Sequence, residues 1–353
     1  MNLLIVKELA NYTKNKINYS RYGLFNGISG NCIFFHELSK SLKITDEYAD
    51  DLLFKLFNSK DINLLKPYFG DGLSGIGWCI EYLLKNGFCK GNRDKVLEDI
   101  DIVVFKAISE NNKIPFGISD GLIGYLIYIL SRLEDNSNSD NSDNYLINVE
   151  LFKTLINKID REAPDYFSFI TTDFKFNLLW TFPILFFLLS KSLKLNIYNT
   201  KIINMIKQWT SYIETLLPSL HSNRLYLAIS LIKLNNLIKS PEIEKQINIL
   251  LFSINFNKII HECDAYSLNV NFSWMGQALI FKKASLMIDS RYPNYDKFAP
   301  VHRDIIKICK PGFEKNILDA LNEVDEEKKP KVGLLNGLSG IGLMYLLYSD
   351  CFE

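Results

Sequence analysis

A short glycine phrase, a polar residue followed by Gly-Leu/Ile-x-Gly, recurs through the chain and constrains its fold more than any other feature. The four clear copies occupy residues 26–30 (NGISG), 71–77 (DGLSGIG), 120–124 (DGLIG) and 336–342 (NGLSGIG). Each copy opens a stretch whose apolar residues have helical spacing. Self-similarity at a regular period is typical of folds built from repeated structural units. The phrase therefore predicts a repeat protein in which every copy begins a helix.

The spacing of the copies predicts how many units the chain holds. The first glycines of the first three copies, Gly27, Gly72 and Gly121, are 45 and 49 residues apart, and the fourth, Gly337, follows after 216 residues. Four steps of 54 residues fill that gap of 216, so we expect three degenerate copies within it. Suitable apolar stretches begin near residues 181, 222 and 276, and only the last keeps its glycine, Gly276. The chain is thus predicted to contain seven units.

Amphipathic stretches lie between the phrases, for example at residues 94–108, 145–159 and 199–217. Their apolar residues at i, i+3 and i+4 indicate helices with one buried face. The stretches that follow the phrases are apolar almost all round, and such helices must be buried on all sides. Seven buried helices, each covered by an amphipathic one, predict an all-α fold: an α/α toroid with one ring of helices inside another. An open solenoid is the alternative architecture.

Two polar stretches interrupt this pattern without ending it. Residues 134–144 (EDNSNSDNSDN) are of low complexity and cannot bury apolar area, which predicts a disordered loop. Residues 325–331 (DEEKKPK) form a second solvated connection. Because the repeat count continues across both stretches, we expect a single domain over residues 1–353.

The balance of charge and the cysteines exclude several classes of protein. The 40 Lys and Arg residues match the 40 Asp and Glu residues, so the basic face of a nucleic-acid-binding protein is not expected. No apolar run reaches the roughly 18 residues that a membrane span requires, and the N-terminus becomes charged too early for a secretory signal. The six cysteines include no C-x-x-C pair, which is typical of reduced thiols. We therefore expect a cytoplasmic protein with no membrane span and no nucleic-acid partner.

Two glycines three residues apart at a helix start indicate close backbone approach or a positive φ on entry. A phosphate-binding loop is disfavoured, because the chain has no G-x-x-x-x-G-K-[ST] motif and no strand is expected before the glycines. If the helices run the same way, their N-termini meet at one end of the barrel and favour anions there. The residues directly before the phrases would line that end: Asn26, Asp71, Asp120, Trp180, His221, Met275 and Asn336.

The seven-unit pattern and its last copy, residues 335–342 (LNGLSGIG), resemble the lanthionine synthetase C-like (LanC-like) peptide cyclases over essentially the whole chain. The resemblance implies an α/α toroid that acts in the maturation of ribosomally made, lanthipeptide-type peptides. Family members close thioether rings by adding a peptide cysteine thiol to a dehydroalanine or dehydrobutyrine. The resemblance also implies a zinc ion held by Cys, Cys and His, which forms the thiolate, and a histidine that handles the enol proton. These roles suit their chemistry, because zinc lowers a thiol pKa and imidazole titrates near neutral pH.

This sequence departs from the family pattern at the zinc and acid–base positions. Trp180 stands in place of the acid–base histidine, and Leu220 in place of one zinc cysteine. Trp274 and Met275 replace the Cys-His pair before Gly276, and Gly117 stands where an acidic residue is expected. Leu and Trp do not bind zinc, and Met is a poor ligand for it. We therefore expect no metal and no cofactor.

Two functions stay open, and with them the question of whether the chain is an enzyme. In the first, the protein binds a modified precursor peptide at the barrel end and promotes zinc-independent cyclisation, with His221 as base. In the second, it is a non-catalytic scaffold that presents the peptide to a dehydratase or another peptide-modifying enzyme. The expected peptide-binding residues are Trp180, Trp274, Met275, Asn26 and Asn336.

Asp71 and Asp120 carry a more distant alternative. Other α/α toroids are glycoside hydrolases, which need two carboxylates that flank the scissile bond. Asp is also a preferred N-cap residue, so capping alone explains an Asp before each of two helices. His221 has a comparable structural interpretation as a hydrogen-bonded residue at a helix start.

Two further motifs are interpreted as structural. Residues 261–264 (HECD) have a spacing unlike that of a zinc site and predict a surface turn. Residues 309–312 (CKPG) predict a turn that ends a helix, because Pro311 cannot supply a backbone N–H.

Overall fold

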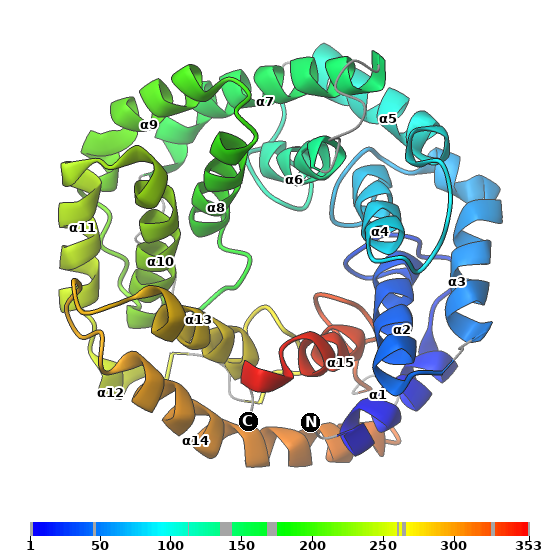
Figure 1. Cartoon of the computed structure of the whole chain (residues 1–353). Coiled ribbons are helices and arrows are strands. Elements are labelled where there is room, and N and C mark those ends of the chain that lie inside the picture. The colour runs from blue at the N-terminus through cyan, green and yellow to red at the C-terminus, as the bar shows by residue number, and fades with distance from the viewer. Residues whose placement is uncertain are drawn as a thin grey trace. The chain divides into compact units, whose positions relative to one another are not determined.

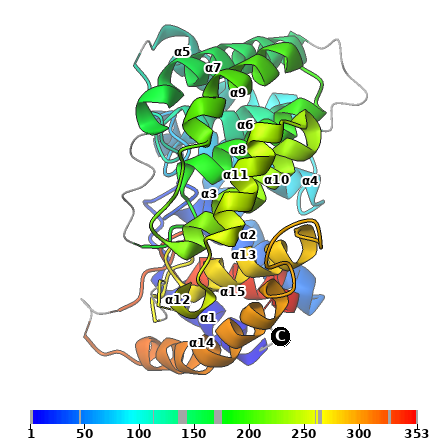
Figure 2. The same ribbon diagram turned by 90° about the vertical axis from the view of Figure 1, so that its left-hand side faces the viewer.

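The structure is a computed structural model that describes residues 3–44, 47–111, 113–134, 143–167, 175–259, 261–262, 266–325 and 329–351. Across these residues the regular secondary structure is helical and no strand occurs (Figures 1 and 2). The predicted all-α class is confirmed. No helix in these ranges combines the length and the apolarity needed to cross a membrane.

The contacts divide the chain into two compact units, which are described separately. Unit 1 comprises Met1–Val6, Ala163–Pro330 and Leu347–Glu353, and unit 2 comprises Lys7–Glu162 and Lys331–Leu346. The predicted single domain and the predicted toroid both concern how these units combine, and they stay predictions.

In unit 2 every clear copy of the glycine phrase begins a helix. These helices are α2 (Ile28–Leu42), α4 (Leu73–Lys85), α6 (Leu122–Leu133) and α15 (Leu338–Leu347). The other elements that lie wholly or mostly in unit 2 are α1 (Leu3–Lys16), α3 (Glu47–Asn58), η1 (Lys60–Leu64), α5 (Arg93–Glu110) and α7 (Asp143–Phe167). Helix α3 packs on α2, α5 packs on α4, and α4 contacts both α2 and α6 (Figure 1). The helices predicted at 94–108 and 145–159 are thus confirmed as α5 and α7.

In unit 1 the three degenerate phrases also begin helices, as predicted. They start α8 (Thr181–Lys194), α10 (His221–Ile238) and α13 (Trp274–Met287). The remaining elements are α9 (Asn199–Ile213), α11 (Pro241–Phe252), α12 (Phe256–Ile259), α14 (Phe298–Leu321) and η3 (Ser349–Cys351). Helix α10 contacts α8, α11 and α13, and α13 packs against α14 (Figures 1 and 2).

The first glycine of a phrase is required for close backbone approach. Gly72 is the N-cap of α4 with φ −140°, an extended conformation, so a positive φ is not its reason. A Cβ at Gly72 would lie 2.3 Å from the carbonyl oxygen of Lys66. That carbonyl accepts the Leu73 N–H at 2.9 Å, so the loop before the phrase folds back onto the helix start. Of the two predicted explanations for the glycines, close approach is the one confirmed.

The second glycine of a phrase lets neighbouring copies touch. A Cβ at Gly75 would lie 1.9 Å from the carbonyl oxygen of Phe69, six residues upstream, and 3.0 Å from Cβ of Leu24 in the first copy. Equivalent contacts relate the other copies: Gly30 lies against Leu334, and Gly124 against Phe69. The copies in unit 2 are therefore ordered last, first, second, third, so the last copy of the chain contacts the first.

The predicted turn at residues 309–312 is wrong, because these residues lie inside α14. Pro311 removes one helical hydrogen bond, which costs roughly 3 kcal/mol in a helix interior. The next turns nevertheless bury Phe313 and Ile317 completely. Burial of two large side chains offsets a cost of this size, so the helix continues to Leu321.

The loop predicted at 134–144 falls mostly outside the described residues. At its edges, Glu134 is the C-cap of α6 and Asp143 is the first residue of α7.

Candidate functional site

Backbone hydrogen bonds join the four loops that precede the helices of unit 2. The N–H of Leu335 donates to Phe25 (3.1 Å), the N–H of Phe25 to Gly70 (2.8 Å), and the N–H of Gly70 to Ser119 (2.7 Å). Each of these residues directly precedes one of the predicted site residues. The ladder therefore brings Asn336, Asn26, Asp71 and Asp120 into consecutive positions along one edge of unit 2, and we call these four residues the polar row.

Side chains reinforce the ladder over three of its four positions. Asn26 donates from its backbone N–H to Oδ1 of Asp71 (2.9 Å) and from Nδ2 to Oδ2 of Asp71 (2.8 Å). Asn336 donates from Nδ2 to Oδ1 of Asn26 at 3.4 Å. Asp71 and Asp120 are exposed, and Asn26 and Asn336 are partly exposed. The row thus presents carboxylate and amide groups to solvent on a backbone that is held by its neighbours.

The capping interpretation of the two aspartates is wrong. The N-caps of α4 and α6 are Gly72 and Gly121, and neither helix has a side-chain cap hydrogen bond. Because the glycine occupies the N-cap position, Asp71 lies one residue too early to cap the helix and binds Asn26 of the neighbouring copy instead.

The geometry also bears on the glycosidase alternative. A glycosidase carboxylate acts by presenting an oxygen to the sugar as nucleophile, acid or base. Both carboxylate oxygens of Asp71 already accept hydrogen bonds from Asn26. This arrangement favours a positioning role for Asp71 over an acid–base role.

His221 lies in unit 1, at the first position of α10. Its Nδ1 accepts the N–H of Asn255 at 3.3 Å, which selects the neutral tautomer with its proton on Nε2. Burial lowers the pKa of His221, and the nearby carboxylate of Glu262 acts in the opposite direction. The lowered pKa favours the neutral ring, and in the tautomer that accepts from Asn255 the proton lies on Nε2. To act as a base through Nδ1, His221 has to exchange Asn255 for a substrate proton.

Glu262 has a structural role in this region that the sequence analysis missed. Its Oε1 accepts the His221 N–H (2.8 Å), and its Oε2 accepts the Ser222 N–H (2.7 Å) and Oγ–H (2.8 Å). Gln277 of α13 donates to Ser222 Oγ at 2.6 Å. The carboxylate thus caps α10, where it also interacts favourably with the helix dipole. The available signal was the absence of a capping residue at Leu220.

We expect removal of this remote cap to destabilise the protein. Glu262→Ala leaves the first N–H groups of α10 without their acceptor, and the loss of a helix cap costs about 1–2 kcal/mol. The free energy of unfolding from urea denaturation measures the effect. Glu214→Ala, an exposed glutamate at the C-cap of α9, is the control and is expected to cost nothing, because a negative charge is unfavourable at a helix C-terminus. Equal losses in the two variants would contradict the capping role.

The surface turn predicted at 261–264 lies partly outside the described residues, because Cys263 and Asp264 are not described. His261 and Glu262 do lie in a turn, with the Glu262 side chain directed at α10 rather than only at solvent.

The large side chains predicted to bind a peptide are buried. Trp180 is 6% exposed, and Trp274 and Met275 are 0% exposed. Trp274 packs edge-on against Phe313 of α14, with 5.6 Å between ring centroids. A peptide can reach Trp274 and Met275 only if the elements that bury them move, and their role in peptide binding stays a prediction.

The zinc that the family resemblance implies does not fit the residues at its expected position. Leu220 offers only a hydrocarbon side chain, and the indole of Trp274 and the thioether of Met275 are fully buried. In the part of the chain that the structure describes, no three His, Cys, Asp or Glu side chains gather closely enough to hold a metal ion.

No protein-family model matches this chain, and no curated protein matches it either. Its LanC-like character consequently stays a prediction from the glycine phrases.

Proposed function

We propose that the protein binds a precursor peptide during the maturation of lanthipeptide-type ribosomal peptides, with the polar row as its binding edge. The observation that carries this proposal is the ladder that aligns Asn336, Asn26, Asp71 and Asp120. The family resemblance of the phrases supplies the class of ligand. In the proposal the protein works in the cytoplasm and presents the bound peptide to a dehydratase or another modifying enzyme.

The chemistry of the polar row suits an extended peptide. Such a peptide exposes backbone N–H and C=O groups, and carboxylate and amide side chains offer the matching acceptors and donors. Asp120 is the exposed carboxylate at the end of the row, next to the position of Asp71. Ladder bonds hold the loops before binding, so less ordering entropy is lost when the peptide docks.

The sharpest test of peptide binding uses Asp120. We expect a fluorescent peptide that contains dehydroalanine and cysteine to bind the protein, and Asp120→Ala to weaken binding about tenfold. Loss of one hydrogen bond to a carboxylate accounts for that factor. Asp319→Ala, which removes an exposed carboxylate from α14 in unit 1, is the matched control. The proposal fails if the peptide does not bind, or if both variants weaken binding equally.

A second candidate function, thioether cyclisation without zinc, is favoured by the neutral, partly exposed His221. In this reaction the base removes the thiol proton, the thiolate sulfur bonds to Cβ of the dehydroalanine, and the resulting enolate takes a proton at Cα. If the bound peptide cyclises faster with the protein, and His221→Ala abolishes that acceleration, the protein is a cyclase. If the peptide binds but cyclises no faster, the protein is a scaffold.

A further inference from the structure

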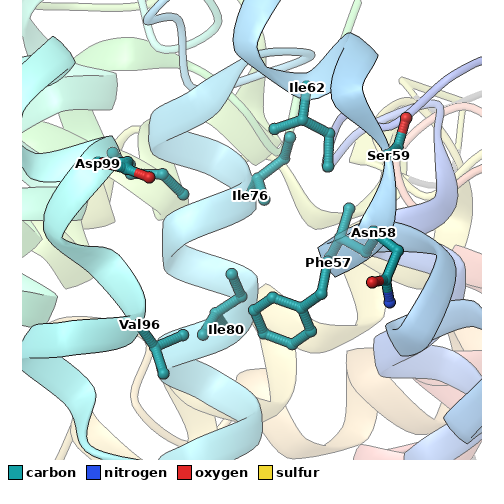
Figure 3. A pocket seen from close by; sticks show the side chains of 10 residues that line it. Phe57, Asn58, Ser59, Ile62, Ile76, Ile80, Val96 and Asp99 are labelled. Atoms are coloured by element: carbon teal, nitrogen blue, oxygen red, sulfur yellow. The ribbon is translucent and has the colours of Figure 1, made fainter.

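Two adjoining hollows form a groove on unit 2, and none of the residues that line them belongs to the polar row. The first, of about 290 Å³, lies between the end of α3 and the start of α5, and α4 forms its floor. Figure 3 shows Phe57 and Ile62 on one side, Val96 and Asp99 on the other, and Ile76 and Ile80 between them. The second hollow, of about 310 Å³, shares Ile62, Asp99 and Ile100 with the first and continues to Ile102 and Val103. Together they extend along α5 from Val96 to Val103, which is about two helical turns, or roughly 10 Å.

Large apolar side chains stand exposed along both walls of this groove. Phe57 is 49% exposed on the α3 side, and Ile102 is 47% exposed on the α5 side. Phe54 (68%) lies one turn before Phe57, and Phe105 (43%) lies one turn after Ile102. Apolar surface that is gathered around a groove, rather than scattered singly, marks an interaction site.

The charge of the groove restricts what can occupy it. Among its lining residues that the structure describes, Asp99 alone carries a charge, and it borders both hollows. Its side chain is exposed at the rim, above an apolar floor that includes Ile76 and Ile80. A complementary ligand therefore carries apolar side chains for the floor and one cationic group for the rim.

We propose that this groove docks an amphipathic helix of a partner protein, with a Lys or Arg of that helix paired to Asp99. A helix that crosses two turns of α5 presents apolar side chains at i, i+4 and i+7 on one face, which is the helix-in-groove mode of recognition. An adjacent basic residue then reaches the carboxylate at the rim. The lining of this groove shares no residue with the polar row, and the proposal does not depend on the proposed peptide function.

Binding of a designed helix tests the proposal on the full-length protein. The probe is a fluorescein-labelled amphipathic peptide with Leu at i, i+4 and i+7 and one Lys beside this face. We expect saturable binding by fluorescence anisotropy, no comparable binding of a scrambled peptide of the same composition, and at least tenfold weaker binding to Asp99→Lys. A second peptide, with Glu in place of the Lys, is expected to recover binding to Asp99→Lys.

A control on the same helix separates pairing from general electrostatics. Glu98→Lys makes the same change of charge one residue away, at an exposed position that lines neither hollow. It is expected to change the affinity less than threefold, while Phe57→Ala weakens binding through the apolar wall. Far-UV circular dichroism checks that each variant is folded.

Three results would overturn the proposal. The first is that neither designed peptide binds better than the scrambled one. The second is that Asp99→Lys and Glu98→Lys weaken binding equally, which means that only the overall charge matters. The third is a dimer in light scattering that Phe57→Asp converts to a monomer, which assigns the groove to a second copy of the chain.

Discussion

Replacing Arg132 with methionine is expected to lower the free energy of unfolding by about 3–5 kcal/mol, the range for breaking a buried ion pair from one side. The Arg132 side chain is 1% exposed in unit 2. Its guanidinium contacts Glu81 of α4 at 2.7 Å, and Asp94 and Asp101 of α5 at 2.8 Å each. Methionine fills a similar volume but removes the cation that pairs with Asp94 and Asp101, while Glu81 keeps its contact with Arg93.

The surrounding hydrogen bonds explain why this residue matters so much. Tyr128 donates to Asp101 at 2.6 Å, and Arg93 donates to Glu81 at 2.6 Å. The network thus joins α4, α5 and α6, the helices of the second and third copies. Burial alone lowers the pKa of Arg132, but the neighbouring carboxylates, Asp101 foremost, more than offset it and hold that pKa above its ordinary value.

The free energy of unfolding that Arg132→Met loses is expected to become smaller as the pH falls. Burial already raises the pKa of Asp101 above its ordinary value, while Arg132 acts to lower it. Without Arg132 the pKa of Asp101 in the folded state rises further, whereas the pKa in the unfolded state does not change. A group whose folded pKa is raised stabilises the fold in its protonated form, and that stabilisation is lost as pH rises through the folded pKa. The free energy of unfolding that the protein loses in Arg132→Met is therefore smallest at acidic pH.

Urea denaturation at pH 7 and at pH 5 measures both effects. Arg161→Met is the matched control, because Arg161 is 62% exposed and pairs only with its neighbour Glu162 among the ion pairs described. An exposed pair of this kind contributes about 0–1 kcal/mol. Adding Asp101→Asn to Arg132→Met is expected to restore part of the loss. Equal costs for Arg132→Met and Arg161→Met would contradict a central role for the network.

Gly75→Ala is expected to lower the free energy of unfolding by about 3 kcal/mol, at the upper end of the range for overpacking. The added Cβ would lie 1.9 Å from a backbone carbonyl oxygen, that of Phe69, which cannot rotate away as a side chain can. Alanine has the higher helix propensity by about 1 kcal/mol, so without this clash the change would be favourable. The peptide at Phe69 precedes Gly70, whose N–H and C=O both belong to the ladder.

At two other glycines an added Cβ would be less crowded, so their substitution by alanine is expected to cost less stability. A Cβ at Gly276 in unit 1 would lie 3.1 Å from the carbonyl oxygen of Val270, so Gly276→Ala is expected to cost less. A Cβ at Gly117 would meet only Oδ1 of Asp120, at 3.4 Å, so Gly117→Ala is expected to be neutral or slightly stabilising. Thermal and urea unfolding of the three variants rank them. If Gly117→Ala costs as much as Gly75→Ala, crowding at the phrase is not what requires glycine.

The helices could be predicted from the sequence because their signals are local. The phrases mark the starts of α2, α4, α6 and α15, and apolar spacing alone locates the starts of α8, α10 and α13, where most of the glycines are lost. The spacing also predicts the buried faces of these helices, since periodicity is a property of neighbouring residues. The turn predicted at Pro311 is wrong, because the packing of α14 overrides the local preference of proline for a helix end.

The candidate site could be predicted only in part. The position before each phrase correctly indicates Asn26, Asp71 and Asn336 as neighbours, because equivalent positions of packed repeats lie together. The same rule places Trp180 and Met275 at the barrel end, but their side chains are only 6% and 0% exposed. Burial by residues distant in the chain leaves no mark on the sequence near the phrase.

The sequence by itself determined the all-helical class and where the phrase helices begin, because glycine spacing and apolar periodicity act over a few residues. Only the tertiary structure decided which groups meet: Asn336 with Asn26, 310 residues apart, Glu262 with the start of α10, and Arg132 with its carboxylates on two other helices. These contacts depend on how helices pack, and packing depends on the combined shape and charge of residues distant in the chain. A repeated motif can therefore reveal its own period while the partners of each copy appear only once the helices are packed.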